Sequence, residues 1–145
     1  MSTREMQQRL VENLREWQKI ETAQIGLIGG VLETTSNPVV SVIMEIIQRD
    51  SQMHHRVQQL LIDSLECRVV SLESEDVELI REKLASHLAM EEETVRLAES
   101  SLAALSGSEL TLQEYLMDFL RRDEEKHRDL LKGLERVLGP TAGAE

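Results

Sequence analysis

Apolar positions recur every three or four residues over four long stretches of the chain, which is the period of an amphipathic α-helix. The four stretches run from about Thr3 to Leu32, Pro38 to Leu65, Ser74 to Leu105 and Thr111 to Leu138. Each stretch of roughly 28 residues makes a helix roughly 40 Å long, at about 1.5 Å per residue. Four such helices with short connections predict an all-α fold, an antiparallel four-helix bundle built from two helical hairpins.

Residues that start or stop helices stand at the ends of these stretches. The signals are Ser2 with Glu5, Asn37 with Pro38, Ser74, Thr111 with Glu114, and Gly139 with Pro140. Residues 66–73 show no helical stripe and are interpreted as a connection. We therefore expect one bundle domain over residues 1–138 and a C-terminal tail over 139–145. Whether the connection crosses the length of the bundle or joins neighbouring helix ends stays open.

The spacing also predicts which face of each helix is buried. On the first helix this line is Leu10, Leu14, Trp17, Glu21, Gln24 and Ile28. On the second it is Val40, Ile43, Ile47, Asp50, His54, Val57 and Leu61. On the third it is Ile80, Leu84, His87, Glu91, Val95, Ala98 and Leu102. Acidic residues and histidines thus stand at positions where a bundle is expected to be apolar.

Composition narrows the classes of function. The chain has 27 acidic and 16 basic side chains and a net charge of −11, so it lacks the basic surface that binds nucleic acid or anionic membranes. No apolar run is long enough for a membrane span, and the N-terminus does not resemble a signal peptide. The single cysteine, Cys67, excludes an internal disulfide and a four-cysteine metal site. We expect a cytoplasmic protein with no nucleic-acid or membrane partner.

A short segment recurs along the chain. Residues 48–54 read QRDSQMH and residues 121–127 read RRDEEKH, at an offset of 73 positions. Each copy lies in the middle of the second helix of a predicted hairpin. The chain therefore looks like two related helical hairpins.

The second predicted hairpin carries the clearest chemistry. Glu91 lies 16 residues before Gly107, at the centre of the turn, and Glu124 lies 17 residues after it, so both fall at the same height of an antiparallel pair. His127 shares a face with Glu124 because it is three residues further on. Carboxylates and an imidazole inside a bundle require charge compensation, which a divalent metal provides. His87, one turn before Glu91, is a candidate further ligand or partner.

A Glu on one helix and Glu-x-x-His on the next resembles the ferritin-like di-iron carboxylate superfamily, of the rubrerythrin or bacterioferritin kind. The resemblance covers the whole predicted bundle and implies a ferritin-like fold. In the first hairpin the same spacing falls on Gln18, Ser51 and His54, where only His54 is a usual ligand. Glu21, one turn away from Gln18, or Asp50, beside Ser51, is the candidate replacement for a missing carboxylate.

The resemblance implies a metal site formed by Glu91, Glu124, His127, His54 and Glu21. It implies that the site binds iron, as two ions or one, in preference to manganese or zinc. The remaining interpretation is a member of the superfamily that has lost its metal. The expected activities are ferroxidase or peroxidase chemistry; whether an external partner supplies electrons stays open. The residues themselves assign no catalytic group. The alternative is a metal-free ferritin-like bundle that acts as a non-enzymatic interaction or structural protein.

Two segments carry more apolar residues than one helix face needs. These are residues 39–47 of the second helix and residues 25–32 at the facing end of the first. Burial on two sides predicts a subunit interface, and we expect a homodimer. Gly26, Gly29 and Gly30 are predicted to let the first two helices approach closely.

Overall fold

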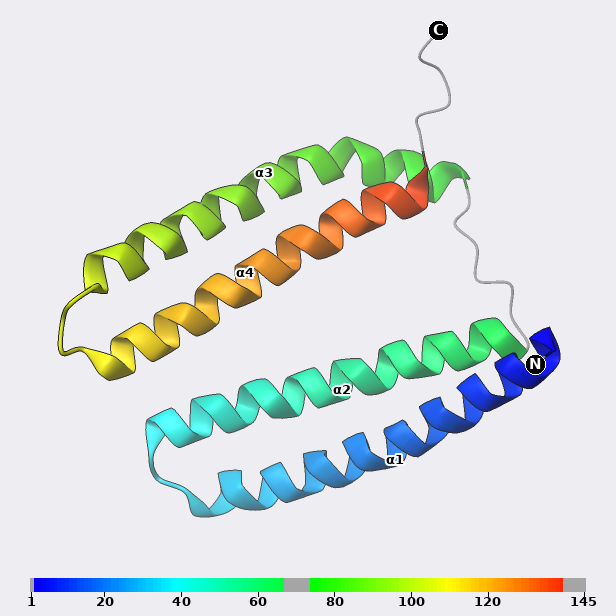
Figure 1. Cartoon of the computed structure of the whole chain (residues 1–145), viewed down its shortest axis with the longest axis horizontal. Helices are drawn as coiled ribbons and strands as arrows, with labels where there is room; N and C mark the ends of the chain where they lie inside the picture. Colours follow the sequence, from blue (N-terminus) through cyan, green and yellow to red (C-terminus); the bar gives the residue numbers. More distant parts are fainter. Residues whose placement is uncertain (1, 67–73, 140–145) are drawn as a thin grey trace, which may run out of the picture. The chain divides into compact units, whose positions relative to one another are not determined.

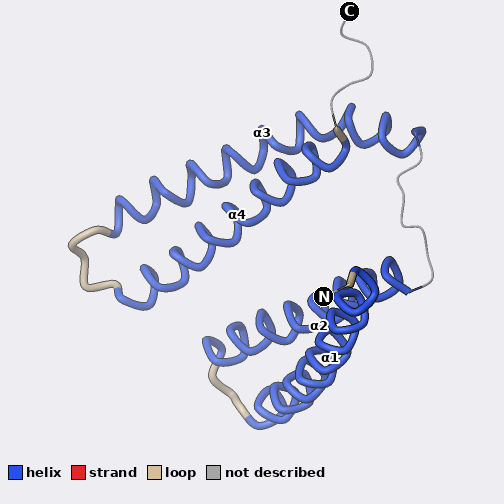
Figure 2. Tube along the Cα trace, turned by 45° about the vertical axis from the view of Figure 1, so that its right-hand side comes forward, coloured by secondary structure: helices blue, strands red, loops and turns tan. Residues whose placement is uncertain are grey.

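The computed structural model describes residues 2–66 and 74–139, and this part of the chain folds into four α-helices without strands. The helices are α1 (Thr3–Thr34), α2 (Pro38–Glu66), α3 (Ser74–Leu105) and α4 (Thr111–Leu138). Helix α1 packs antiparallel to α2, and α3 packs antiparallel to α4 (Figure 1). Short loops, drawn in tan in Figure 2, close each pair. The all-α class and the two helical hairpins are confirmed.

Each hairpin forms a compact unit of its own. The predicted union of the two hairpins in one bundle, the choice of connection between them and the single domain over 1–138 stay predictions. Cys67, the rest of the connection at 67–73, and tail residues 140–145 lie outside the described residues.

The start of α1 and the turn between α1 and α2 agree with the signals in the sequence. The Ser2 hydroxyl accepts a hydrogen bond from the Glu5 amide, and the Glu5 carboxylate accepts one from the Ser2 amide, which completes the predicted capping box. Asn37 Oδ1 accepts from the amides of Val39 and Val40 at 3.0 and 3.2 Å. These bonds satisfy amides that have no partner inside the helix.

One other predicted cap is wrong. Helix α4 has Leu110 at its N-cap and no side-chain cap, because the Ser108 hydroxyl accepts from the Leu110 amide and this turn places Thr111 already inside the helix. Helix α3 begins at Ser74, and the predicted cap by this residue stays a prediction. At the other end of α4, Gly139 adopts a φ of 73°, which favours glycine and ends the helix as predicted.

The core of the first hairpin is apolar at the open end and polar in the middle. Val11 and Leu14 of α1 pack on Ile62 of α2. Further along, the buried residues are Glu21 and Ile28 on α1, and Ser51 and Gln58 on α2. Burial of Glu21 agrees with the sequence prediction.

The predicted buried line of α2 is wrong for the face that contacts α1. Ser51, Gln58 and Ile62 are buried there, whereas His54 and the predicted Val57 are exposed. Helix α2 is apolar on two sides, and its more polar side is the one that packs against α1. Spacing alone does not tell these two sides apart.

In the second hairpin α3 contributes the buried apolar residues Leu84, Val95 and Ala98, as predicted. Helix α4 has no fully buried residue, so its inner face is only partly covered by α3. His87 is exposed, which contradicts its predicted place on the buried line. Because successive residues rotate by about 100°, His87 falls at the edge of the face that Glu91 shares.

Large apolar side chains remain exposed on both hairpins, among them Leu27, Val42, Leu130 and Val137. Leu27 and Val42 lie in the two segments where the sequence shows an apolar surplus; the homodimer stays a prediction. The prediction that Gly26, Gly29 and Gly30 let α1 and α2 approach closely is wrong. A Cβ at Gly26 or Gly30 meets no atom within 4 Å, and one at Gly29 lies 3.8 Å from Gln48 Nε2.

Among the described residues no helix combines the length and apolar character of a membrane span.

Candidate metal centre

Three potential ligands meet in the middle of the second hairpin. Glu91 comes from α3, and Glu124 and His127 come from α4; one ligand atom of each lies within 4.8 Å of the others. His127 Nδ1 is 3.5 Å from Glu124 Oε2 and 3.7 Å from Glu91 Oε2. The structure therefore brings together the three residues that the spacing around Gly107 predicts.

Glu91 has the polar atom that most needs a partner in this cluster. Its side chain is 16% exposed, and Oε2 is buried without a hydrogen bond. A buried charged oxygen without a partner is costly, more so than a neutral one. Two carboxylates and a neutral imidazole together carry two negative charges, which a divalent cation would neutralise.

Two further side chains contact the ligands on α4. The Thr94 hydroxyl lies 3.0 Å from Glu124 Oε2, and it also lies 2.9 Å from the backbone carbonyl of Glu91. Asp123 Oδ2 lies 3.3 Å from His127 Nε2, while its other oxygen pairs with Lys126. A carboxylate next to Nε2 favours the tautomer that carries the proton there, which leaves the Nδ1 lone pair facing Glu91 and Glu124.

The first hairpin holds a smaller cluster around Glu21. This carboxylate is only 3% exposed. Its Oε1 accepts from Trp17 Nε1 at 3.0 Å and lies 3.1 Å from His54 Nδ1, whereas Oε2 makes no hydrogen bond. Glu21 and His54, both predicted as ligands, are therefore neighbours within this hairpin.

Burial by itself raises the pKa of the Glu21 carboxyl. The Ser51 hydroxyl, followed by His54 and Trp17, more than offsets this effect, and the pKa lies below its ordinary value of 4.5. The cluster thus favours an ionised Glu21.

The other candidate positions in the first hairpin have different roles. Gln18, at the position that corresponds to Glu91, donates from Nε2 to the His55 carbonyl at 3.3 Å and to Gln59 Oε1 at 3.1 Å. It therefore braces α1 against α2. Asp50 is exposed on α2. Of the two predicted replacements for the missing carboxylate, the structure places Glu21, and not Asp50, inside the hairpin.

The offset of 73 positions relates the two clusters in a way that the sequence reading missed. It pairs His54 with His127, Ser51 with Glu124, and Glu21 with Thr94. In the first hairpin the carboxylate is on the first helix and the hydroxyl on the second; in the second hairpin these two groups are exchanged. The signal was present in the repeat, but Thr94 was not on the predicted buried line.

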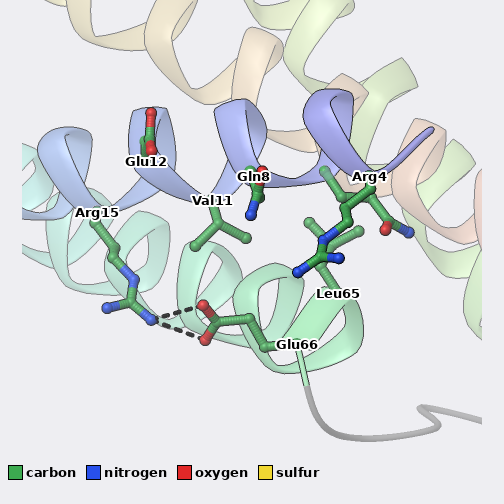
Figure 3. Close-up of a pocket in the computed structure, with 8 residues that line it drawn as sticks. Arg4, Gln8, Val11, Glu12, Arg15, Leu65 and Glu66 are labelled. Carbon is green, nitrogen blue, oxygen red and sulfur yellow. Dashed lines mark hydrogen bonds and ion pairs between the residues drawn. The ribbon is translucent and has the colours of Figure 1, made fainter. Parts of the chain in front are cut away.

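A separate cavity of about 330 Å³ lies at the open end of the first hairpin, among Val11, Leu65 and several polar side chains. Its most prominent polar contact is the ion pair of Arg15 with Glu66, in which one guanidinium nitrogen lies 2.8 Å from both carboxylate oxygens (Figure 3). Neither candidate cluster lines this cavity.

Comparisons of the chain with protein-family models, with curated proteins and with solved structures found no match. Any functional assignment consequently depends on the site itself.

Proposed function

We propose that this chain is a ferritin-like metal-binding protein whose principal site consists of Glu91, Glu124 and His127. The observation that carries the proposal is Glu91 Oε2, a buried oxygen without a hydrogen bond that faces two further potential ligands. A bound cation supplies the missing partner and offsets the cost of that burial.

The donor set indicates the kind of metal. Carboxylates with one imidazole suit iron, manganese and zinc. We propose iron first, with manganese and zinc as alternatives. Bound iron would supply redox chemistry with oxygen or peroxide, of the ferroxidase or peroxidase type. The residues of the chain bind and orient the ion: Glu91 from α3, and Glu124 with His127 from α4.

We also propose that Glu21 and His54 bind metal within the first hairpin. They are a carboxylate and an imidazole 3.1 Å apart, with one carboxylate oxygen still free of hydrogen bonds. We further propose that the chain works as a homodimer. The exposed apolar faces of α1 and α2 support the dimer.

A second candidate is a metal-free interaction or structural protein. The same exposed apolar side chains favour it, because such faces mark interaction surfaces. In this case Trp17 and His54 are the partners of Glu21 Oε1, and the second hairpin takes up no ion.

Elemental analysis of the purified protein, before and after anaerobic loading with Fe(II) and removal of unbound metal, separates the two candidates. We expect at least one metal ion per chain in the wild type and a loss of that ion in Glu91→Gln. Glu92→Gln is the matched control, because Glu92 is the exposed neighbour that contacts Lys132 at 3.6 Å. Wild-type protein that takes up no metal, or a Glu91→Gln variant that retains it, contradicts the proposal.

A further inference from the structure

The Thr94 hydroxyl bridges the two helices of the second hairpin at the level of the metal cluster. It lies 3.0 Å from Glu124 Oε2 on the facing helix and 2.9 Å from the Glu91 carbonyl of its own helix. Thr94 is one turn after Glu91, so its side chain projects from the same face of α3. The hydroxyl therefore contacts one proposed ligand directly and follows another along the helix.

A hydroxyl has a single proton, so Thr94 donates to one of these two acceptors at a time. The Glu91 carbonyl lies inside a helix, where a backbone carbonyl already accepts the amide four residues further on. A hydrogen bond to a carboxylate is also the stronger of the two, because the acceptor is charged. While Glu124 is ionised, donation to Glu124 Oε2 is therefore favoured.

The first hairpin provides an independent parallel. Ser51 of α2 and Glu21 of α1 are both buried, and the Ser51 hydroxyl lowers the pKa of the Glu21 carboxyl; the carboxylate and the hydroxyl are on opposite helices from those in the second hairpin. Both hairpins thus place one hydroxyl across from one carboxylate at corresponding levels. The pair of hydroxyl and carboxylate recurs although its two members have exchanged helices. This recurrence indicates that the hydroxyl acts on the carboxylate.

We propose that Thr94 is a positioning residue of the metal site, which holds Glu124 Oε2 beside His127 Nδ1 and Glu91. This inference rests on the proposed function. Glu124 is a long side chain on a helix face that α3 covers only in part, and it would otherwise sample several rotamers. The hydrogen bond from Thr94 restrains the carboxylate before the ion arrives, so less conformational freedom is lost on binding.

The test compares Thr94→Val, which has the same shape without the hydroxyl, with Thr94→Ser, which keeps the hydroxyl. Ser101→Ala is the matched control, because the Ser101 hydroxyl also bonds to its own helix, at 2.8 Å from the Leu97 carbonyl. Mn²⁺ affinity is measured by competition with a chromophoric chelator, and the visible spectrum of the Co²⁺ form reports ligand geometry. Loss of a group that orients a metal ligand typically lowers affinity about 10- to 100-fold.

We expect Thr94→Val to weaken Mn²⁺ binding by about 10-fold or more and to change the Co²⁺ spectrum. Thr94→Ser should bind within about threefold of wild type, and Ser101→Ala should be unchanged. Far-UV circular dichroism checks that each variant folds, and Thr94→Ala replaces the valine variant if that one does not.

Wild-type affinity and an unaltered Co²⁺ spectrum in Thr94→Val overturn the positioning role and leave the metal site standing. A general weakening in which Thr94→Ser is as poor as Thr94→Val assigns Thr94 to packing and also overturns the role. If the wild type binds neither ion, the proposed function itself fails, which is a distinguishable result.

Discussion

Replacement of Glu91 by methionine should change the stability of the protein in opposite directions with and without metal. In the metal-free protein Glu91 Oε2 is a buried charged atom with no hydrogen bond. Such a group costs about 1–3 kcal/mol, and we take the low end, about 1 kcal/mol, because the side chain keeps 16% of its exposure. Methionine has a similar length and no charge, so Glu91→Met should be more stable by about 1 kcal/mol in a chelator.

Bound metal reverses this order. At a free ion concentration 100 times the dissociation constant, an ion that binds only the folded state stabilises it by about 2.7 kcal/mol. The variant has lost a ligand and gains little, so the wild type should become the more stable protein by roughly 1.7 kcal/mol. With a urea m-value of about 2 kcal/mol/M, the midpoints differ by about 0.5 M in chelator and about 0.9 M, with the opposite sign, in metal.

The assay is urea unfolding followed by circular dichroism, in EDTA and in excess Mn²⁺. Glu92→Met is the control and should show no reversal, because Glu92 is exposed. The reasoning is refuted if Glu91→Met is less stable than wild type in EDTA, since Glu91 would then have a partner. It is equally refuted if Mn²⁺ stabilises Glu91→Met as much as the wild type.

Three other predictions concern separate parts of the chain. The pKa of Glu21 is lowered in the folded protein, so the ionised carboxylate stabilises the fold fully above about pH 4.5, and this stabilisation is lost as the pH falls through the folded-state pKa. Acid titration of the metal-free protein, followed by circular dichroism, should therefore show a flatter loss of stability in Glu21→Gln than in the wild type. Gly26→Ala and Gly30→Ala should each raise the free energy of unfolding, measured in urea, by about 0.5–1 kcal/mol, because alanine favours the helix and an added Cβ meets no neighbour. A destabilised variant would mean that another surface covers these glycines. Asp123→Ala should weaken Mn²⁺ binding by about 10-fold because His127 loses the carboxylate beside Nε2, and Asp123→Asn should recover part of the affinity. Equal Mn²⁺ affinity in the wild type and both variants would exclude a role for Asp123.

The helices could be predicted from the sequence because their signals are local. The apolar period, the Ser2 capping box, Asn37 before Pro38 and the final Gly139 each act within a turn or two of the residue concerned, and the structure agrees with them. The predicted cap at Thr111 is wrong because a capping residue and the first helical residue differ by one position, a shift that composition does not resolve.

The second hairpin site was predictable because its geometry follows from counting. An antiparallel pair places residues equally far from the turn at the same height, and Glu91 and Glu124 satisfy this around Gly107. The side of α2 that packs against α1 was not predictable in this way. Both sides of α2 carry apolar residues, so a periodic pattern alone does not select the side occupied by Ser51 and Gln58.

The exchange of carboxylate and hydroxyl explains why the first hairpin looks incomplete in sequence. A search for Glu-x-x-His finds Ser51 three residues before His54 and reports a lost ligand, although Glu21 supplies a carboxylate from the facing helix. The difference that matters is at Gln18, which replaces the second carboxylate with an amide that braces the hairpin.

The number of carboxylates distinguishes the two proposed ion-binding clusters. Around Glu21 there is one carboxylate, which accepts a hydrogen bond from Trp17 and lies 3.1 Å from His54 Nδ1. In the second hairpin two carboxylates, those of Glu91 and Glu124, meet beside one imidazole. A divalent cation offsets more negative charge in the second cluster, so we expect metal to fill the second hairpin before the first.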